Sequence, residues 1–196
     1  MKKVSKKHVI FADADDFFLP DAFTIFKNTL NSDNDICYYK VSSVYSDTFK
    51  PATRHIGVNR LVERFKEDEN ELRLKHIVPW GKVFLSSYIK KNEFNFDAVP
   101  ASNDVMFGVY TGFYASKINV VDETVYCITM NGGSISNTIS KRNNKSRYKV
   151  ALKYNKFLRQ KNMKQYQNSI RPLFFNSLRF GLKEVFYYWY LLFKFN

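Results

Sequence analysis

The sequence contains few of the residues that interrupt or cross-link a chain. Its 196 residues include only 7 Gly, 5 Pro and 2 Cys. Cys37 and Cys127 lie far apart, and neither belongs to a Cys-x-x-Cys pair, which excludes a zinc ribbon or a disulfide scaffold. We therefore expect a reducing, cytoplasmic location. The scarcity of Gly and Pro and the lack of any repeat also exclude collagen-like and linker-rich architectures.

Long apolar runs are absent as well. No window reaches the roughly 18 to 20 apolar residues that a membrane-spanning helix requires. The basic segment 1–7 is not followed by an apolar stretch, so we expect no signal peptide.

Aromatic residues and positive charge are abundant instead. Aromatic residues make up 17% of the chain, and the net charge is +13. Such a charge attracts polyanions, namely nucleic acid, an anionic membrane or a phosphate-bearing substrate. No nucleic-acid-binding motif accompanies the charge, so we expect no nucleic-acid partner.

The apolar pattern predicts an α/β fold followed by a helical tail. The apolar run at 8–12 is typical of a buried strand in a parallel sheet. Further strands are expected at 36–45 and at 118–129, the latter as a strand pair or one bent strand. Helical spacing recurs at 19–30, 58–65, 106–113 and 145–160. We place the domain boundary near residue 140, giving an α/β domain at 1–140 and a basic, aromatic helical tail at 141–196.

An acidic turn, Asp13-Ala14-Asp15-Asp16, follows the first predicted strand. The first and third side chains of this motif can converge, and two close carboxylates repel each other unless a cation lies between them. Hard oxygen ligands suit Mg²⁺ or Mn²⁺, which also bind phosphate oxygens. The turn therefore indicates a metal–phosphate site at the end of a strand. The alternative is an exposed acidic loop that only begins the next helix.

Haloacid-dehalogenase-like phosphatases also carry Asp-x-Asp after an N-terminal strand. In those enzymes Thr or Val stands two residues after the second Asp, usually preceded by Gly. Here Asp16 and Phe17 occupy these positions, and an aromatic ring would crowd a phosphoryl pocket. A phosphatase-like, Mg²⁺-dependent hydrolase is therefore disfavoured but stays open.

Taken together, the motifs of the chain resemble those of family 2 glycosyltransferases of the GT-A fold, the type found in bacterial capsule and lipopolysaccharide synthesis. The segments that carry the resemblance follow one another along the chain at 9–20, 79–84, 102–104 and 126–136. The resemblance implies a GT-A-like, partly Rossmann-like mixed sheet flanked by helices, with a C-terminal helical tail.

The resemblance also implies an inverting transfer of sugar from a nucleotide-sugar donor to a saccharide or lipid-linked acceptor. Asp15 and Asp13 would bind Mn²⁺ or Mg²⁺ on the donor diphosphate. Asp16 would also belong to the donor site, either beside the metal or orienting a neighbouring group. Asp104 would act as the general base that deprotonates the acceptor hydroxyl. Acceptor contacts would come from the residues Trp80, Lys82 and Asn103. More ordinary roles stay open: Trp80 as a core anchor, Lys82 as a solvated side chain and Asp104 as a helix cap.

Two departures from the family pattern affect this interpretation. Asn103 stands where the family has Glu before the base. Only about eight residues precede the strand that leads to the acidic turn, whereas the family places half of its nucleotide site there. We expect either a fragment or mis-started reading frame, or a site completed by a partner chain, including a homo-oligomer. A catalytically inactive, membrane-associated remnant is the alternative function.

The segment 170–195 is rich in aromatic residues with Arg and Lys interspersed. This composition fits the membrane interface, and a lipid-linked acceptor would place such an enzyme on the inner face of the cell membrane. The rival interpretation is a helix that packs over the catalytic domain or forms an oligomer interface.

Overall fold

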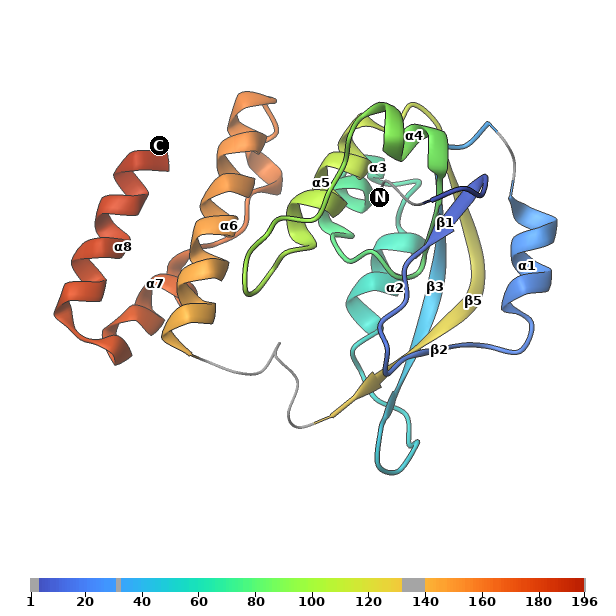
Figure 1. Cartoon of the computed structure of the whole chain (residues 1–196), viewed down its shortest axis with the longest axis horizontal. Helices are drawn as coiled ribbons and strands as arrows, with labels where there is room; N and C mark the ends of the chain where they lie inside the picture. Colours follow the sequence, from blue (N-terminus) through green and yellow to red (C-terminus); the bar gives the residue numbers. More distant parts are fainter. Residues whose placement is uncertain (1–3, 31–32, 132–139, 196) are drawn as a thin grey trace. The chain divides into compact units, whose positions relative to one another are not determined.

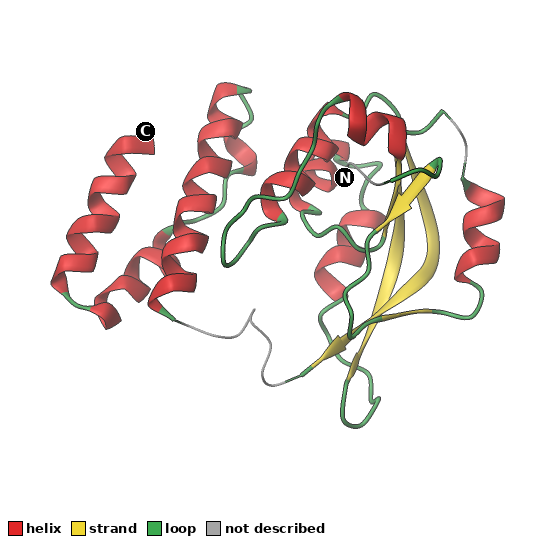
Figure 2. Cartoon of the chain, in the orientation of Figure 1, coloured by secondary structure: helices red, strands yellow, loops and turns green. Residues whose placement is uncertain are grey.

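A computed structural model describes residues 4–30, 33–131 and 140–195. Its contacts divide the chain into two compact units, each of which has its own secondary structure (Figures 1 and 2). The first unit comprises Met1–Asn95 and Phe107–Gly132, and the second comprises Phe96–Met106 and Gly133–Asn196. The segment 96–106, which the sequence pattern grouped with the α/β domain, thus groups with the C-terminal helices.

The first unit is built on a five-stranded mixed sheet with the strand order β1-β4-β3-β5-β2. The strands are β1 (His8–Ile10), β2 (Phe17–Phe18), β3 (Ile36–Tyr45), β4 (Lys82–Leu85) and β5 (Ile118–Met130). Strands β3 and β5 pair in parallel, whereas β1–β4, β3–β4 and β2–β5 pair antiparallel.

The long strands β3 and β5 form the centre of the sheet. The strand predicted at 36–45 is confirmed, and its residues 36–39 are all buried because elements cover both faces of the sheet. Strand β5 is a single strand whose register against β3 shifts on either side of Lys40. Such a shift bends a strand and increases its twist, so the bent-strand alternative is the one observed.

The prediction for the first strand is wrong in two respects. Strand β1 lies at an edge of the sheet, and it pairs antiparallel with β4 rather than parallel. Its residues are half-buried. Strand β1 has only three residues, too few for their pattern to distinguish a central parallel strand from an edge strand.

Helices cover both sides of this sheet. They are α1 (Ala22–Thr29), α2 (Ile56–Glu63), α3 (Glu69–Lys75), α4 (Ser86–Lys91) and α5 (Val105–Tyr114). Figure 1 shows α1 on one side and α2, α3 and α5 on the other. Ala22 and Phe26 of α1 pack into the main core with Tyr39 and Val41 of β3.

Helix α5 packs closely against the C-terminal end of α3 and the residues after it. A Cβ atom on Gly108 would lie 2.0 Å from the carbonyl oxygen of Ile77, and one on Gly112 would lie 1.9 Å from that of Arg73. Glycine is thus required at both positions because the backbones approach each other. The Arg73 guanidinium also donates hydrogen bonds to the carbonyl oxygens of Gly112 and Ala115 at 3.0 and 2.7 Å, at the end of α5.

The second unit is helical. It contains α6 (Lys141–Gln160), η2 (Lys164–Tyr166), α7 (Arg171–Asn176), η3 (Ser177–Phe180) and α8 (Leu182–Phe195). Tyr148 and Leu152 of α6 form a core with Tyr188 and Leu191 of α8. Asn144 of α6 ties this core together, because its amide donates to the Tyr188 hydroxyl at 2.9 Å. Within the residues described, no helix is both long and apolar enough to cross a bilayer.

Candidate functional site

The acidic turn lies on the segment that links the two edges of the sheet. Strand β1 is at one edge and β2 at the other, so residues 11–16 must cross between them. The turn closes with a hydrogen bond from the Asp16 N–H to the Asp13 carbonyl oxygen at 3.2 Å. Strand β2 then pairs with β5, with Phe17 opposite Cys127. This pairing places the turn beside the C-terminal part of β5, where it runs parallel to β3.

Two residues of β5 hold the turn in position. The Tyr126 hydroxyl accepts a hydrogen bond from the Asp13 N–H at 2.9 Å and donates one to Asp16 Oδ2 at 2.8 Å. The Thr129 N–H donates to Asp16 Oδ1 at 2.7 Å. The Thr129 hydroxyl donates to the Asp15 carbonyl oxygen at 2.8 Å. The carboxylate of Asp16 is therefore bound at both oxygens by the protein itself.

The three aspartates consequently differ in what they present to a ligand. Asp13 and Asp15 are exposed, whereas Asp16 is half-buried and fixes the turn. Asp16 was predicted to lie at the donor site, beside the metal or orienting a neighbouring group. Its bonds to Tyr126 and Thr129 fix the turn, and its contact with the donor stays a prediction.

The donor set of the turn suits a hard divalent cation. Exposed carboxylate oxygens are the ligands that Mg²⁺ and Mn²⁺ prefer. Among the described residues, no group of three or more His, Cys, Asp or Glu side chains is arranged to hold a metal. Asp13 and Asp15 would be the residues that hold such a cation, and Mg²⁺ at phosphate sites commonly keeps waters and substrate oxygens as further ligands.

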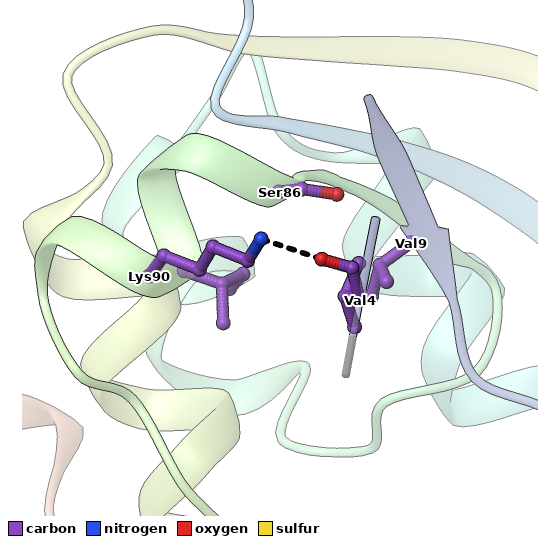
Figure 3. Close-up of a pocket in the computed structure, with 5 residues that line it drawn as sticks. Val4, Val9, Ser86 and Lys90 are labelled. Atoms are coloured by element: carbon purple, nitrogen blue, oxygen red, sulfur yellow. Dashed lines mark hydrogen bonds between the residues drawn. The ribbon is translucent and has the colours of Figure 1, made fainter. Parts of the chain in front are cut away.

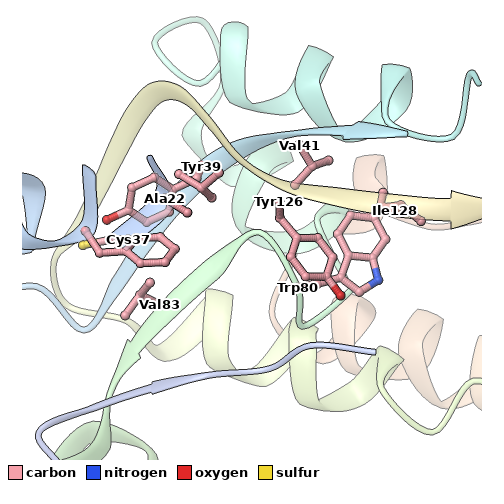
Figure 4. Packing of buried hydrophobic residues seen from close by; sticks show 10 residues of the cluster. Ala22, Cys37, Tyr39, Val41, Trp80, Val83, Tyr126 and Ile128 are labelled. Carbon is pink, nitrogen blue, oxygen red and sulfur yellow. The ribbon is translucent and has the colours of Figure 1, made fainter. Parts of the chain in front are cut away.

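Tyr126 connects the turn to the hydrophobic core. Its ring lies almost parallel to that of Trp80 (Figure 4), with centroids 6.3 Å apart and an interplanar angle of 16°. It also meets the Phe18 ring edge-on, with centroids 5.3 Å apart. Burial raises the pKa of the Tyr126 hydroxyl, so it stays a proton donor to Asp16. No local pattern predicts this role, because Tyr126 resembles any aromatic residue of a buried strand and contacts residues more than 100 positions away.

The predicted acceptor residues Trp80 and Lys82 both lie inside the fold. Trp80 is 3% exposed and Lys82 is 1% exposed. Gly81 between them has a φ of +68°, and a Cβ atom there would lie 2.8 Å from Val41. The turn at Gly81 therefore needs glycine, and it is followed directly by β4, which begins at Lys82. The Lys82 ammonium donates to the His76 carbonyl oxygen and lies 5.2 Å from the centre of the Tyr38 ring. We therefore correct the expectation of a solvated or acceptor-facing side chain, and we propose no acceptor contact for either residue.

The Lys82 ammonium also influences a neighbouring histidine. His76 is fully buried, and burial together with the nearby positive charge of Lys82 holds its pKa well below the usual value of 6.5. The neutral ring packs against Tyr38 at 5.4 Å, in a structural rather than a ligand-binding environment.

Asn103 and Asp104 belong to the second unit. They end the segment 96–106, directly before α5, which begins at Val105. This segment is fastened to α6: the Ser146 hydroxyl donates to the Ala101 carbonyl oxygen at 2.7 Å, and the Lys153 ammonium contacts the Asp97 carboxylate at 2.8 Å. Asn103 is exposed and Asp104 is half-buried. Their catalytic and acceptor roles stay predictions.

Two further features bear on the extent of the site. Residues 132–136, the end of the fourth segment of the family resemblance, lie outside the described residues.

A small pocket with room for about one water molecule is lined by residues of 4–9 and α4, where Lys90 donates to the Val4 carbonyl oxygen (Figure 3). It is below the size range of typical ligand pockets and therefore does not suit a nucleotide sugar.

Comparison with known proteins identifies the fold. No protein-family profile and no curated protein sequence matches the chain. The structure is nevertheless similar to that of TarS from S. aureus, a family 2 glycosyltransferase with the GT-A fold. The TM-score with TarS 1-349 is 0.54 at 16% identity, covering 78% of this chain and 41% of that one.

Two other TarS structures agree. A longer TarS chain gives a TM-score of 0.55 at 15% identity, covering 78% of this chain and 25% of that chain. TarS 1-349 in complex with UDP gives 0.50 at 16% identity, covering 99% of this chain and 47% of that chain. At these identities the likeness shows the fold alone, and the predicted GT-A-like mixed sheet flanked by helices is confirmed. The chain spans less than half the length of the TarS chains that it matches.

Proposed function

We propose that this chain is a glycosyltransferase domain that transfers a sugar from a nucleoside-diphosphate sugar to an acceptor hydroxyl. The observation that carries the proposal is the pair of exposed aspartates, Asp13 and Asp15, on a turn that Asp16 fastens to β5. Support comes from the similarity of the fold to TarS, one structure of which contains UDP. UDP is therefore our first candidate for the nucleotide.

In this proposal some residues at the turn bind the metal and others position those ligands. Asp13 and Asp15 hold Mn²⁺ or Mg²⁺ together with the donor diphosphate. A bound cation would supply positive charge that stabilises the diphosphate as it leaves. Asp16, Tyr126 and Thr129 keep the two ligands in place, which reduces the cost of ordering them when the donor binds.

Asp104 is the proposed general base. It takes the proton of the acceptor hydroxyl while the acceptor oxygen bonds to the anomeric carbon and the bond from that carbon to the diphosphate oxygen breaks. A single displacement of this kind inverts the anomeric centre and needs no covalent enzyme intermediate. We propose a saccharide or lipid-linked acceptor, as used in the synthesis of surface polysaccharides.

Donor binding tests the proposal directly. We expect isothermal titration calorimetry to show that UDP binds the full chain in the presence of Mn²⁺ and much more weakly in EDTA. Asp15→Ala should weaken the Mn²⁺-dependent binding by roughly tenfold or more, because it removes a charged ligand of the cation. Asp47→Ala is the matched control, since Asp47 is also exposed and lies in the same unit, in the loop after β3.

UDP affinity that is equal with Mn²⁺ and with EDTA would overturn the metal-dependent binding, and a lack of UDP binding in both conditions would overturn donor binding by this chain. An Asp15→Ala variant that binds like the wild type would instead remove the acidic turn from the site. A Mn²⁺-dependent affinity that is lost in Asp15→Ala and retained in Asp47→Ala supports the assignment.

A further inference from the structure

Helix α8 exposes a continuous apolar face to solvent. The face consists of Leu182 (74% exposed), Phe186 (74%), Trp189 (55%), Tyr190 (58%) and Phe193 (66%). The last four follow Leu182 by four, seven, eight and eleven residues, so all five share one side of the helix. We call this set the α8 apolar face. Phe175 and Leu178, which precede α8, are also more than half exposed.

This face is separate from the side of the helix that packs. Tyr188 and Leu191 point the other way, into the core shared with α6, and are 0% and 4% exposed. Helix α8 is therefore apolar on both sides, although only one side is covered. Contiguous exposed aromatic surface of this kind marks an interaction site in a folded protein.

The charge of the protein is concentrated in the same part of the chain. Residues 141–196 contain 14 of the 31 Lys and Arg residues but only one of the 18 acidic residues, Glu184. This segment therefore carries a net charge of +13, the same as the whole chain, and the remaining residues sum to zero. Glu184 is itself paired with Lys141 at 2.8 Å.

Lysines border the α8 apolar face along one margin. Lys183 and Lys194 are exposed, and their positions on the helix lie next to the apolar side chains. Beside them, the Lys145 ammonium of α6 lies 3.8 Å from the centre of the Tyr187 ring. Long lysine stems can lie along an apolar surface while their charged ends reach the headgroup region of a bilayer.

From this arrangement we infer that the α8 apolar face docks on an anionic lipid membrane, with the helix lying in the plane of the interface. The aromatic rings enter the boundary between headgroups and acyl chains, and the basic rim contacts anionic headgroups. Helix α8 has 14 residues and would be about 21 Å long, too short to span the roughly 30 Å hydrocarbon core. A second copy of the chain is a poorer partner, because it would bring two +13 segments together. The inference does not depend on the proposed enzymatic function.

Vesicle binding tests this surface, and the protein contains its own reporter. Of its two tryptophans, Trp80 is buried at 3% exposure, so a change in emission on adding vesicles reports Trp189. We expect the full chain to float with vesicles of phosphatidylcholine and phosphatidylglycerol, with a blue shift of emission. Vesicles of phosphatidylcholine alone should bind it much more weakly.

Two sets of variants separate the apolar and the charged contributions. Phe186→Ser with Phe193→Ser should weaken binding to anionic vesicles by roughly tenfold or more, because two inserted rings are lost. Lys183→Glu with Lys194→Glu should weaken it and reduce its dependence on salt. Phe49→Ser is the matched control and should bind like the wild type, since Phe49 is as exposed as Phe193, at 66%, but lies in the first unit.

Either of two results would overturn the inference. Binding to anionic vesicles that survives in the Phe186→Ser, Phe193→Ser variant would show that charge alone is responsible. A lack of vesicle binding, with an oligomer that this variant dissociates in analytical ultracentrifugation, would assign the face to a second copy of the chain. Neither result depends on UDP binding, so the two proposals can fail separately.

Discussion

The hydroxyl group of Tyr126 joins the two ends of the acidic turn. Tyr126 is the one side chain described here that bonds to both ends of the turn, at the Asp13 N–H and the Asp16 carboxylate. Its ring is held between Trp80 and Phe18, so the position of the hydroxyl is set by the core. Tyr126 is therefore a positioning residue in the proposed site.

Removal of that hydroxyl should have two measurable effects. In Tyr126→Phe the ring packing is kept, but the Asp13 N–H loses its acceptor and Asp16 loses one donor. We expect the free energy of unfolding to fall by about 1.5–3 kcal/mol in urea denaturation, the usual contribution of a hydrogen bond to a charged group. Mn²⁺-dependent UDP binding should weaken as well.

Tyr45→Phe provides the comparison, because Tyr45 is 44% exposed at the end of β3. Its unfolding midpoint and UDP affinity should match the wild type. If Tyr126→Phe unfolds at the wild-type urea concentration, the hydroxyl does not hold the turn.

At the residue scale, the acids at 13–16 could be proposed as ligands from the sequence, because carboxylates directly after an apolar strand suit a metal–phosphate site. The burial of Trp80 was one of the two roles left open. The burial of Lys82 was not expected, because it depends on a carbonyl group at His76 that only the folded chain brings near. A lysine in a Gly-containing turn otherwise looks like a surface residue.

Among the elements, the contact between α3 and α5 is the most restrictive. Gly112→Ala would place a methyl group 1.9 Å from the Arg73 carbonyl oxygen, so the helices must separate. We expect a loss of about 1–3 kcal/mol in the free energy of unfolding, more than the gain in helix propensity of up to about 1 kcal/mol. Thermal unfolding followed by circular dichroism measures this change.

The opposite sign is expected for Gly57→Ala in α2. A Cβ atom there meets no other atom within 4 Å, so only the helix propensity changes and the protein should become slightly more stable. Equal shifts of the melting temperature in the two variants would show that the close approach of α3 and α5 is not maintained in solution.

Helices and strands could be predicted where they are long enough to show an apolar period. The strand expected at 36–45 and the helix expected at 145–160 are long enough for their apolar patterns to be recognised, and the structure has them at 36–45 and 141–160. Strand β2 has two residues and β1 has three, and both exist because β5 and β4 pair with them. Pairing between distant segments is decided by tertiary structure, which a local pattern does not contain.

On the scale of the whole molecule, the two units differ in core, charge and proposed task. The first unit holds the acidic turn and the core of β3, β5 and α1, and the second holds the core of α6 and α8. Net charge is confined to residues 141–196. The structure therefore assigns the candidate donor ligands and the proposed membrane surface to separate units with separate cores.

Separate cores predict separate responses to a core mutation. Leu191 is 4% exposed in the core of the second unit, and Leu191→Ala should destabilise that unit by about 2–5 kcal/mol through the lost contacts and the cavity. We expect hydrogen–deuterium exchange to accelerate in α6 and α8 and to stay at wild-type rates in β3 and β5, because local unfolding follows cooperative units.

A substitution in the core of the first unit tests the same independence from the other side. Ile36 is fully buried on β3, so Ile36→Ala should accelerate exchange in β3 and β5 and leave α6 and α8 protected. Acceleration of all four elements in either variant would mean that the chain unfolds as one unit. If the chain unfolds as one unit, a substitution that destabilises α8 would also unfold the acidic turn and so weaken UDP binding. If instead exchange is confined to the mutated unit, Leu191→Ala should retain Mn²⁺-dependent UDP binding while losing its affinity for anionic vesicles.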